Sequence, residues 1–259
     1  MGERTAIEWA TKTWEVMQGC NQVSPGCARC WAKRLAEGRL RRFYPGGFEQ
    51  VEPKPSKLME PVRWKTPQRV FVSSRSDFFH KQISDRWRDM CFATMREAPQ
   101  HTFLLLTKRA EKLAVYHPKY ADGSAAPWPP NVWAGVSVEY QRWANHRVPL
   151  LLQSSARIRW VSVEPILGPI ELRPWLPKYT WDYGNGEAVD WVVVGDESGK
   201  GRRPAKLEWI RSLRDQCQEA GGAFYFKQWH GAGQKISLPL LDGQQWAEWP
   251  ADLRVREMP

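Results

Sequence analysis

Three cysteines lie within residues 20–30, whose sequence CNQVSPGCARC has the spacing C-x6-C-x2-C. Three thiolates on one loop can bind an inorganic centre and leave one coordination position open for chemistry. The Ser-Pro-Gly segment between the first two cysteines supplies turn residues, so the chain can fold back on itself. The spacing therefore predicts a metal or cluster site with Cys20, Cys27 and Cys30 as its ligands.

Three interpretations of these cysteines stay open, and the softness and number of the ligands favour the first. A [4Fe–4S] cluster bound by three cysteines keeps one iron free for a further ligand. A structural zinc site usually has four ligands, so His80, Cys91 or Cys217 would have to supply the fourth, although none of them belongs to a paired ligand spacing. In the third interpretation the thiols bind nothing. Cys91 and Cys217 lie in helical patterns and are expected to be ordinary packed thiols.

The composition is that of a globular protein. With 259 residues, of which 42% are hydrophobic, the chain can bury a large core. No apolar stretch is long enough to cross a membrane and the N-terminal residues do not resemble a secretion signal, so we expect no membrane association and a cytoplasmic location. Five cysteines, three of them clustered, suit metal binding in a reducing compartment better than a disulfide framework.

The charge of the chain favours a polyanionic partner. Its formal net charge is +10, and basic residues are concentrated at 39–42 and 200–203. The chain also contains 16 tryptophans, and exposed tryptophans stack on nucleic-acid bases. Nucleic acid is therefore the candidate partner, although a solvated basic surface and tryptophans in the core would give the same composition.

The chain alternates between strand-like and helix-like segments. Short β-branched and aromatic runs predict strands, and helical spacing between them predicts helices. The predicted strands are Thr13–Met17, Arg69–Ser73, Thr102–Leu106, Asn131–Val136, Ile158–Val163, Asp190–Val194 and Ala223–Lys227, and the predicted helices are Ala28–Arg42, Asp85–Ala98, Lys108–Tyr116, Glu139–Leu152 and Leu207–Ala220. Nearly continuous apolar strands are typical of a parallel sheet covered on both faces. We expect one α/β domain over residues 1–259, a partial or complete (β/α) TIM-like barrel with surface insertions near 118–130 and 172–187.

Polar residues follow the predicted strands. In α/β barrels the carboxyl ends of the strands form the face that carries the active site, and the cysteine loop also follows a strand. Serine and acidic residues after a strand are also common helix caps, so any one of them is weak support. Six such loops together predict a shared polar site. Its candidate residues are Ser73, Ser74, Asp77, Lys108, Arg109, Glu139, Glu164 and Lys227.

The chain also resembles a known family. The resemblance begins with Ile7-Glu8-Trp9, Thr13-Trp14, Gly19-Cys20, Val23-Ser24-Pro25-Gly26-Cys27 and Cys30-Trp31-Ala32, and continues with Ser76-Asp77-Phe78-Phe79-His80, Leu106-Thr107-Lys108-Arg109, Gly135-Val136-Ser137-Val138-Glu139, Glu164-Pro165, Glu197-Ser198-Gly199 and Phe226-Lys227-Gln228-Trp229. These segments resemble the phage gene-product 37/68 family, which is described by its three-cysteine motif. They extend over nearly the whole chain.

The cysteine motif of that family is similar to that of radical S-adenosylmethionine (radical SAM) enzymes. Those enzymes usually have the spacing C-x3-C-x2-C, and members with a longer first gap exist. The resemblance implies a radical-SAM-like barrel with a [4Fe–4S] cluster on Cys20, Cys27 and Cys30. The cluster would reductively cleave S-adenosylmethionine, and the resulting 5′-deoxyadenosyl radical would abstract hydrogen from a substrate.

On this interpretation the strand-end residues bind the cofactor and the substrate. Ser73, Ser74 and Asp77 are candidates for the methionyl moiety, Glu139 and Glu164 for ribose or amine groups, and Lys108, Arg109 and Lys227 for a substrate phosphate or carboxylate. The expected electron donor is reduced flavodoxin or ferredoxin. Charge and the phage association make a nucleic acid or a nucleotide the expected substrate, in modification or repair.

Two alternatives belong to other classes. In the first, zinc on the three cysteines and His80 stabilises a nucleic-acid-binding protein that has no catalytic activity. In the second, Asp77, Glu139, Glu164 and His80 bind a metal ion in a hydrolase. These residues lie in separate loops and form no close-spaced motif, so the hydrolase ranks last.

Overall fold

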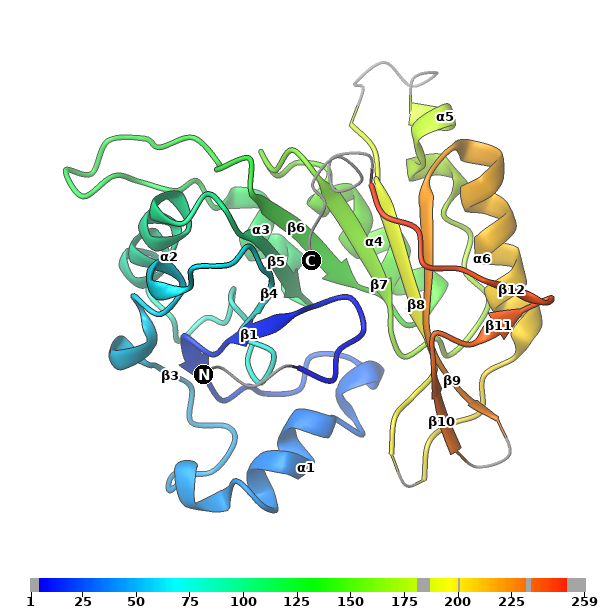
Figure 1. Ribbon diagram of the computed structural model, residues 1–259, viewed down its shortest axis with the longest axis horizontal. Helices are drawn as coiled ribbons and strands as arrows, with labels where there is room; N and C mark the ends of the chain where they lie inside the picture. Colours follow the sequence, from blue (N-terminus) through cyan, green and yellow to red (C-terminus); the bar gives the residue numbers. More distant parts are fainter. Residues whose placement is uncertain (1–4, 181–186, 200, 232–233, 251–259) are drawn as a thin grey trace. The chain divides into compact units, whose positions relative to one another are not determined.

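The computed structural model describes residues 5–180, 187–199, 201–231 and 234–250. It is an α/β fold whose main sheet has the strand order β1-β4-β5-β6-β7-β8-β9-β10. The pairs β1–β4, β4–β5, β7–β8 and β8–β9 are parallel, and β9–β10 is antiparallel. The predicted α/β class with a mostly parallel sheet is therefore confirmed. The chain divides into two compact units (Figure 1).

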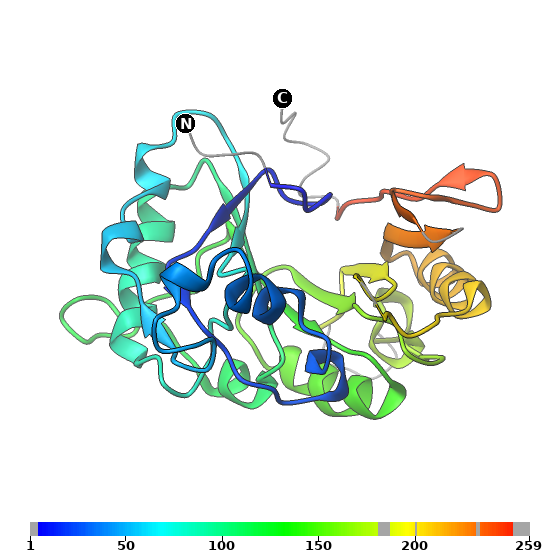
Figure 2. The ribbon, with the colours of Figure 1, turned by 90° about the horizontal axis from the view of Figure 1, so that it is seen from below.

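Unit 1 comprises residues 1–134 and 154–157. Its strands are β1 Lys12–Trp14, β2 Met17–Gln18, β3 Glu52–Pro53, β4 Arg69–Val72, β5 Thr102–Thr107 and the first part of β6 Val132–Ser137. Its α-helices are α1 Trp31–Glu37, α2 Asp85–Glu97 and α3 Ala110–Val115, and its short 3-10 helices are η1 Pro25–Cys27, η2 Arg41–Phe43, η3 Pro55–Lys57 and η4 Pro61–Arg63. Figures 1 and 2 both show α2 along the outer side of β4 and β5.

The strands of unit 1 form where buried apolar runs meet in register. Val70 of β4 lies opposite Phe103 of β5, and both side chains are fully buried. Trp14 of β1 packs against Phe103 with ring centroids 5.8 Å apart. Ser84 caps the start of helix α2, and its hydroxyl accepts a hydrogen bond from the backbone N–H of Trp87 at 3.2 Å. These contacts fix the carboxyl ends of β1, β4 and β5, from which the site residues of unit 1 project.

Unit 2 comprises residues 135–153 and 158–259. It contains the rest of β6 and the elements β7 Arg159–Val163, β8 Trp191–Gly195, β9 Ala223–Gly231, β10 Gln234–Ser237, β11 Leu240–Leu241, β12 Gln244–Gln245, α4 Gln141–Leu151, η5 Arg173–Trp175, α5 Pro177–Thr180 and α6 Leu207–Ala220. Helix α6 packs against β9. It ends at Gly221, whose φ of 73° is left-handed, as expected for a glycine that terminates a helix.

All seven predicted strands are present, and the five predicted helices contain α1, α2, α3, α4 and α6. The strand predicted at Thr13–Met17 is wrong in its extent, because the chain turns between β1 and β2. The insertion at 118–130 has a single described bridge, Lys119 with Ala125. The insertion at 172–187 contains η5 and α5, and its residues 181–186 lie outside the described part, as does Lys200 of the basic run. The boundary between the two units falls within strand β6. Whether the chain is a single domain stays a prediction.

None of the described helices combines the length and the apolar character that a membrane crossing requires.

Candidate functional site

The three cysteines of residues 20–30 lie on one loop of unit 1. Ala32, Ala36, Tyr44 and Phe48 form a small buried cluster, and both Cys20 and Cys30 pack against it. All three thiols are partly exposed, whereas Cys91 and Cys217 are fully buried. Cys91 and Cys217 are therefore packed thiols, as predicted, and the ligand role of Cys20, Cys27 and Cys30 stays a prediction.

Cys27 and Cys30 are arranged by consecutive tight turns. The backbone N–H of Cys27 donates to the carbonyl of Ser24 at 2.9 Å, and that of Cys30 donates to the carbonyl of Cys27 at 3.1 Å. Side chains three residues apart in such turns project to the same side. The hydroxyl of Ser24, which is buried, lies 3.9 Å from Cys27 Sγ. The predicted turn at Ser-Pro-Gly is confirmed as the short helix η1.

Gly19 places Cys20 at the carboxyl end of β4. Gly19 pairs with Ser76 in a parallel bridge, and the hydroxyl of Ser76 donates to the Gly19 carbonyl at 2.6 Å. Gly19 has a φ of +83°, and a Cβ on it would lie 2.1 Å from the carbonyl oxygen of Gln50. Only glycine satisfies both conditions. The next residue, Cys20, is fixed by a 2.8 Å bond from its N–H to the carbonyl of Phe48.

Asp77 is the acceptor on which the loops after β4 and β5 converge. Its Oδ1 accepts from Thr107 Oγ1 at 2.6 Å and from its neighbour Phe79 N at 3.0 Å, and its Oδ2 accepts from Lys108 N at 3.2 Å and from Arg109 Nη1 at 2.7 Å. The residue is only 5% exposed. A buried carboxylate with four donors is well satisfied. Its two oxygens are therefore occupied by the chain itself.

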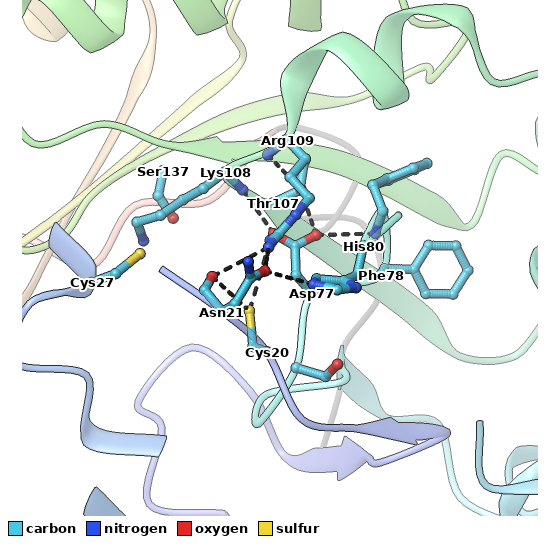
Figure 3. Close-up of polar contacts among 12 residues, drawn as sticks. Cys20, Asn21, Cys27, Asp77, Phe78, His80, Thr107, Lys108, Arg109 and Ser137 are labelled. Carbon is cyan, nitrogen blue, oxygen red and sulfur yellow. Dashed lines mark hydrogen bonds and ion pairs between the residues drawn. The ribbon is translucent and has the colours of Figure 1, made fainter. Parts of the chain in front are cut away.

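Arg109 links Asp77 to the cysteine loop (Figure 3). Its Nη1 lies 3.7 Å from Cys20 Sγ, and its Nη2 donates to the backbone carbonyl of Asn21 at 3.2 Å and to Asn21 Oδ1 at 2.6 Å. Asn21 thus receives two of the bonds from a single guanidinium. Lys108, the other basic residue predicted at this strand end, donates through its backbone N–H to Asp77.

His80 completes the network from the other side of Asn21. Its Nδ1 accepts from the backbone N–H of Gln82 at 3.2 Å, so its Nε2 carries the proton and donates to Asn21 Oδ1 at 2.6 Å. Burial and the nearby Arg109 lower the pKa of His80 to about 4. His80 is therefore neutral at pH 7, with both ring nitrogens hydrogen-bonded.

Cys20 is the thiol most changed by its surroundings. Burial and the negative charge of Asp77 raise its pKa to about 12, against the opposing effect of Arg109. In metal sites cysteine binds as the thiolate, so an electropositive group close to the sulfur favours ligation. Arg109 is that group.

The three cysteines offer soft thiolate donors, the chemistry that a cluster or a soft metal ion takes. Among the described residues, no three His, Cys, Asp or Glu side chains are arranged tightly enough to hold one metal ion. In a [4Fe–4S] cluster each cysteine binds its own iron, so the sulfurs stand further apart than around one ion. Cys20 and Cys30 pack on one apolar cluster and Cys27 lies between them on the same loop, so binding by all three requires their thiols to move toward one another.

Ser73 and Ser74 follow β4 directly but differ in their partners. Ser74 Oγ donates to Glu15 Oε1, and the backbone N–H of Arg75 donates to the other oxygen of Glu15 at 3.3 Å. Ser73 is 2% exposed and has a φ of 57°, an uncommon conformation for a residue with a side chain. In the described part of the chain its buried hydroxyl has no hydrogen-bond partner. An unsatisfied buried hydroxyl in a strained residue is typical of a functional position.

The site residues predicted in unit 2 are paired with each other or with neighbours. Lys227 Nζ lies 2.7 Å from Glu164 Oε1. The Lys227 side chain is 16% exposed and the Glu164 side chain 14%. Glu139 is fully buried, with Arg147 Nη1 3.2 Å from its Oε2. Glu164 and Lys227 thus come together, as predicted for one polar site, while Glu139 forms a separate buried pair. Their contact with a cofactor or substrate stays a prediction.

Sequence reasoning missed several residues of this polar framework. Asn21 is a central acceptor, and its position directly after Cys20 is its only sequence signal. In unit 2, His230 Nδ1 lies 2.8 Å from Asp196 Oδ1, and Arg203 donates to Glu197 through its backbone N–H at 2.8 Å and its Nε at 3.0 Å. His230 and Asp196 are 34 residues apart, and Arg203 and Glu197 are six residues apart in a loop without regular periodicity, so no spacing predicts either pair.

Fold and site together define a class: an α/β protein with a largely parallel sheet, in which a three-cysteine loop lies at the carboxyl ends of strands. The chain belongs to the family described as protein of unknown function DUF5131, whose profile matches residues 4–250. No curated protein and no solved structure matches the chain. The chemistry of the site is therefore argued from its own residues.

Proposed function

We propose that the protein binds a [4Fe–4S] cluster through Cys20, Cys27 and Cys30 and is a radical-SAM-like enzyme. The observation that carries the proposal is a single loop with three partly exposed cysteines, whose Gly19 is bridged to Ser76 in the loop after β4. With three protein ligands, the cluster keeps one iron for S-adenosylmethionine. When bound, the cluster supplies the electron that cleaves the sulfonium.

The loop after β4 supports a cofactor site next to the cysteines. Ser73 holds a buried hydroxyl without a partner and a left-handed backbone conformation. Such a hydroxyl is a donor and acceptor ready for a ligand, and strain of this kind persists where function requires it. Ser73 is therefore our candidate for contact with the polar end of S-adenosylmethionine. Ser74 and Asp77 are already bonded within the chain and organise this loop.

The remaining parts of the proposal come from the fold and the charge. The sheet is proposed to be the partial barrel of a radical-SAM-like enzyme, because the pairs β1–β4, β4–β5, β7–β8 and β8–β9 are parallel and polar loops follow these strands. Glu164 and Lys227 form a partly exposed pair for polar groups of the ligand or substrate. The net charge of +10 supports a nucleic acid or a nucleotide as the substrate. Reduced flavodoxin or ferredoxin is the proposed electron donor.

The zinc-stabilised nucleic-acid-binding protein is the weaker candidate. It requires a fourth ligand, and the sequence offers His80, Cys91 or Cys217. Both ring nitrogens of His80 are hydrogen-bonded, and the two cysteines are fully buried in α2 and α6. Zinc on His80 would have to replace one of these two hydrogen bonds, whereas a three-cysteine cluster leaves both in place.

Anaerobic reconstitution with iron and sulfide tests the proposal. Wild-type protein should bind about four irons per chain and, with dithionite and S-adenosylmethionine, release 5′-deoxyadenosine. Cys20→Ala, Cys27→Ala and Cys30→Ala should each lose the nucleoside product. Cys217→Ala is the matched control, because its thiol is buried in α6 of unit 2, and it should retain the product.

One tightly bound zinc per chain, with no cleavage of S-adenosylmethionine after anaerobic reconstitution, would overturn the proposal. An electrophoretic mobility shift with single- and double-stranded oligonucleotides would then distinguish the binding protein. Binding that weakens steeply with salt would support that alternative.

A further inference from the structure

Arg109 connects three segments of unit 1 that are distant in sequence. Its guanidinium contacts Asp77 at the exit of β4 and Cys20 and Asn21 on the cysteine loop, while its backbone follows β5. The side chain is 13% exposed. A planar guanidinium offers five donors in a fixed fork, so it can bind several acceptors in one rigid arrangement.

The base of Arg109 is itself fixed. Thr107 Oγ1 accepts from the backbone N–H of Arg109 at 2.9 Å and donates to Asp77 Oδ1 at 2.6 Å. Asp77 then accepts from Arg109 Nη1 at 2.7 Å. Thr107, Asp77 and Arg109 therefore form a closed set of bonds. This set leaves the guanidinium little freedom to turn toward another anion.

The free end of the fork is directed at the cysteine loop. Nη2 donates to both the backbone oxygen and the side-chain oxygen of Asn21, and Nη1 lies 3.7 Å from Cys20 Sγ. A substrate phosphate or carboxylate on Arg109 would have to replace Asp77 or Asn21. The arrangement therefore favours a role toward Cys20 over the role in substrate binding that the sequence suggested.

We propose that Arg109, anchored by Asp77, is the positioning residue of Cys20: it fixes the Cys20–Asn21 segment so that Cys20 joins Cys27 and Cys30 as the third thiolate ligand. The inference rests on the proposed function for the identity of the bound group. The contacts by which Arg109 holds Cys20 and Asn21 are present in the protein without any bound metal or cluster. Mutation of groups that orient metal ligands typically weakens metal binding about 10–100-fold.

Cobalt(II) is a suitable probe, because its thiolate charge-transfer absorption reports how many cysteines bind it. Wild-type protein, Cys20→Ala, Arg109→Gln and Arg109→Lys are titrated anaerobically. Arg109→Gln should bind cobalt about 10–100-fold more weakly than wild type. Its charge-transfer intensity per bound cobalt should fall by about one third and match that of Cys20→Ala, because one thiolate of three is lost.

Arg109→Lys separates positioning from charge. Lysine keeps the positive charge but cannot reach Asp77, Asn21 and Cys20 together, so it should behave like Arg109→Gln. Arg88→Gln is the control for a general loss of stability. Arg88 is a buried arginine of unit 1 that donates to the carbonyls of Phe78 and His80. It should keep the wild-type intensity per bound cobalt.

Arg109→Gln leaves the buried Asp77 carboxylate without its only ion-pair partner among the described residues. The double variant Asp77→Asn/Arg109→Gln removes that charge as well and is used if the single variant does not fold. It too should show the spectrum of Cys20→Ala. A wild-type spectrum in Arg109→Gln or in the double variant overturns the inference, as does recovery in Arg109→Lys. Failure of wild type to bind cobalt through three thiolates also overturns it. If wild type shows this cobalt spectrum but neither binds iron nor cleaves S-adenosylmethionine, the proposed function fails and the positioning role stands.

Discussion

Asp77 and Arg109 form an ion pair with 2.7 Å between Oδ2 and Nη1, and both side chains are nearly buried, at 7% and 13% exposure. Desolvation of two charges offsets much of their attraction, so a pair of this kind contributes little net stability compared with apolar residues. Loss of one partner is different, because the other charge then stays buried without compensation. The main effect of the pair is therefore structural: it holds Arg109 in place, and Arg109 in turn joins the loop after β4 to the cysteine loop.

Asp77→Asn should lower the free energy of unfolding by about 2–4 kcal/mol, because the guanidinium of Arg109 then faces an amide in place of a carboxylate. Urea unfolding at pH 7 measures the change. The double variant Asp77→Asn/Arg109→Gln should lose less than the sum of the two single changes, by about 0.5–3 kcal/mol. Additive losses would mean that the two side chains do not act as a pair.

Gly19→Ala should disturb the cysteine loop severely. An added Cβ would lie 2.1 Å from the carbonyl oxygen of Gln50, and the φ of +83° disfavours any side chain. We expect a loss of about 3–4 kcal/mol from overpacking and backbone strain together. Gly47→Ala is the matched control, because Gly47 has a φ of +82° with no atom within 4 Å of the added carbon. It should lose only about 1–2 kcal/mol, and equal losses at the two positions would contradict the clash.

Most strands were predictable because each is a short apolar segment that is recognised from its own residues, without knowledge of its neighbours in the sheet. The segments of β5, β7 and β8 are rich in apolar residues and almost entirely buried, so burial indicates where they lie. The extension of β9 to Gly231 and its partner β10 were not predictable. All four residues of β10 are exposed, so the hairpin carries no hydrophobic alternation that would indicate a strand.

The turn between the cysteines was predictable from its Ser-Pro-Gly sequence, but the polar network around Cys20 was not. Arg109 was expected to bind a substrate anion, since a basic residue after a strand gives no indication of an internal partner. Its actual contacts arise because Asn21, Asp77 and Arg109 meet in space although about 32 residues separate Asp77 from Arg109. Contacts of this kind are set by the parallel pairing of β4 with β5, which a single sequence does not specify.

His80 should make the stability of the ligand-free protein fall as the pH is lowered. Burial and Arg109 lower its folded-state pKa to about 4 from an ordinary value of 6.5. Between these values the unfolded chain binds more protons than the folded one, so stability is fully present above pH 6.5 and is lost as the pH falls toward 4. The loss attributable to His80 should reach at most about 3 kcal/mol.

Urea unfolding between pH 7 and pH 4 for wild type and His80→Gln isolates this contribution, because glutamine does not titrate. The variant should lose less stability over the range. His117→Gln, at an exposed histidine of the same unit, is the control and should keep the wild-type profile. Parallel profiles for wild type and His80→Gln would show that the ring is not held neutral by its surroundings.

The five thiols should differ in reactivity toward iodoacetamide in the folded, metal-free protein. Burial raises the pKa of Cys91 and of Cys217, and both are fully buried, so they should react only after unfolding. Burial and Asp77 raise the pKa of Cys20 to about 12, so it should react at least about tenfold more slowly than Cys27 or Cys30. Mass spectrometry of peptides from timed samples measures each rate. Equal rates for Cys20 and Cys27 would contradict the buried environment of Cys20.

Ser73→Ala should leave the stability of the ligand-free protein unchanged or slightly higher. The hydroxyl that it removes is buried and lacks a hydrogen-bond partner among the described residues, so no bond is lost. Ser76→Ala is the contrast, because it removes a 2.6 Å hydrogen bond to Gly19 and should cost about 1 kcal/mol. Thermal unfolding of both variants without ligand measures the difference.

A contact with the bound ligand would explain why Ser73 keeps a buried hydroxyl that has no hydrogen-bond partner among the described residues. If Ser73 Oγ contacts a charged group of S-adenosylmethionine, Ser73→Ala should weaken binding to the reconstituted protein about 10–100-fold, the equivalent of one charge-assisted hydrogen bond. Isothermal titration calorimetry under anaerobic conditions measures it. Unchanged affinity in a variant of unchanged or higher stability would show that the unpartnered hydroxyl serves no ligand, and the strained turn at Ser73 would then have only a structural role.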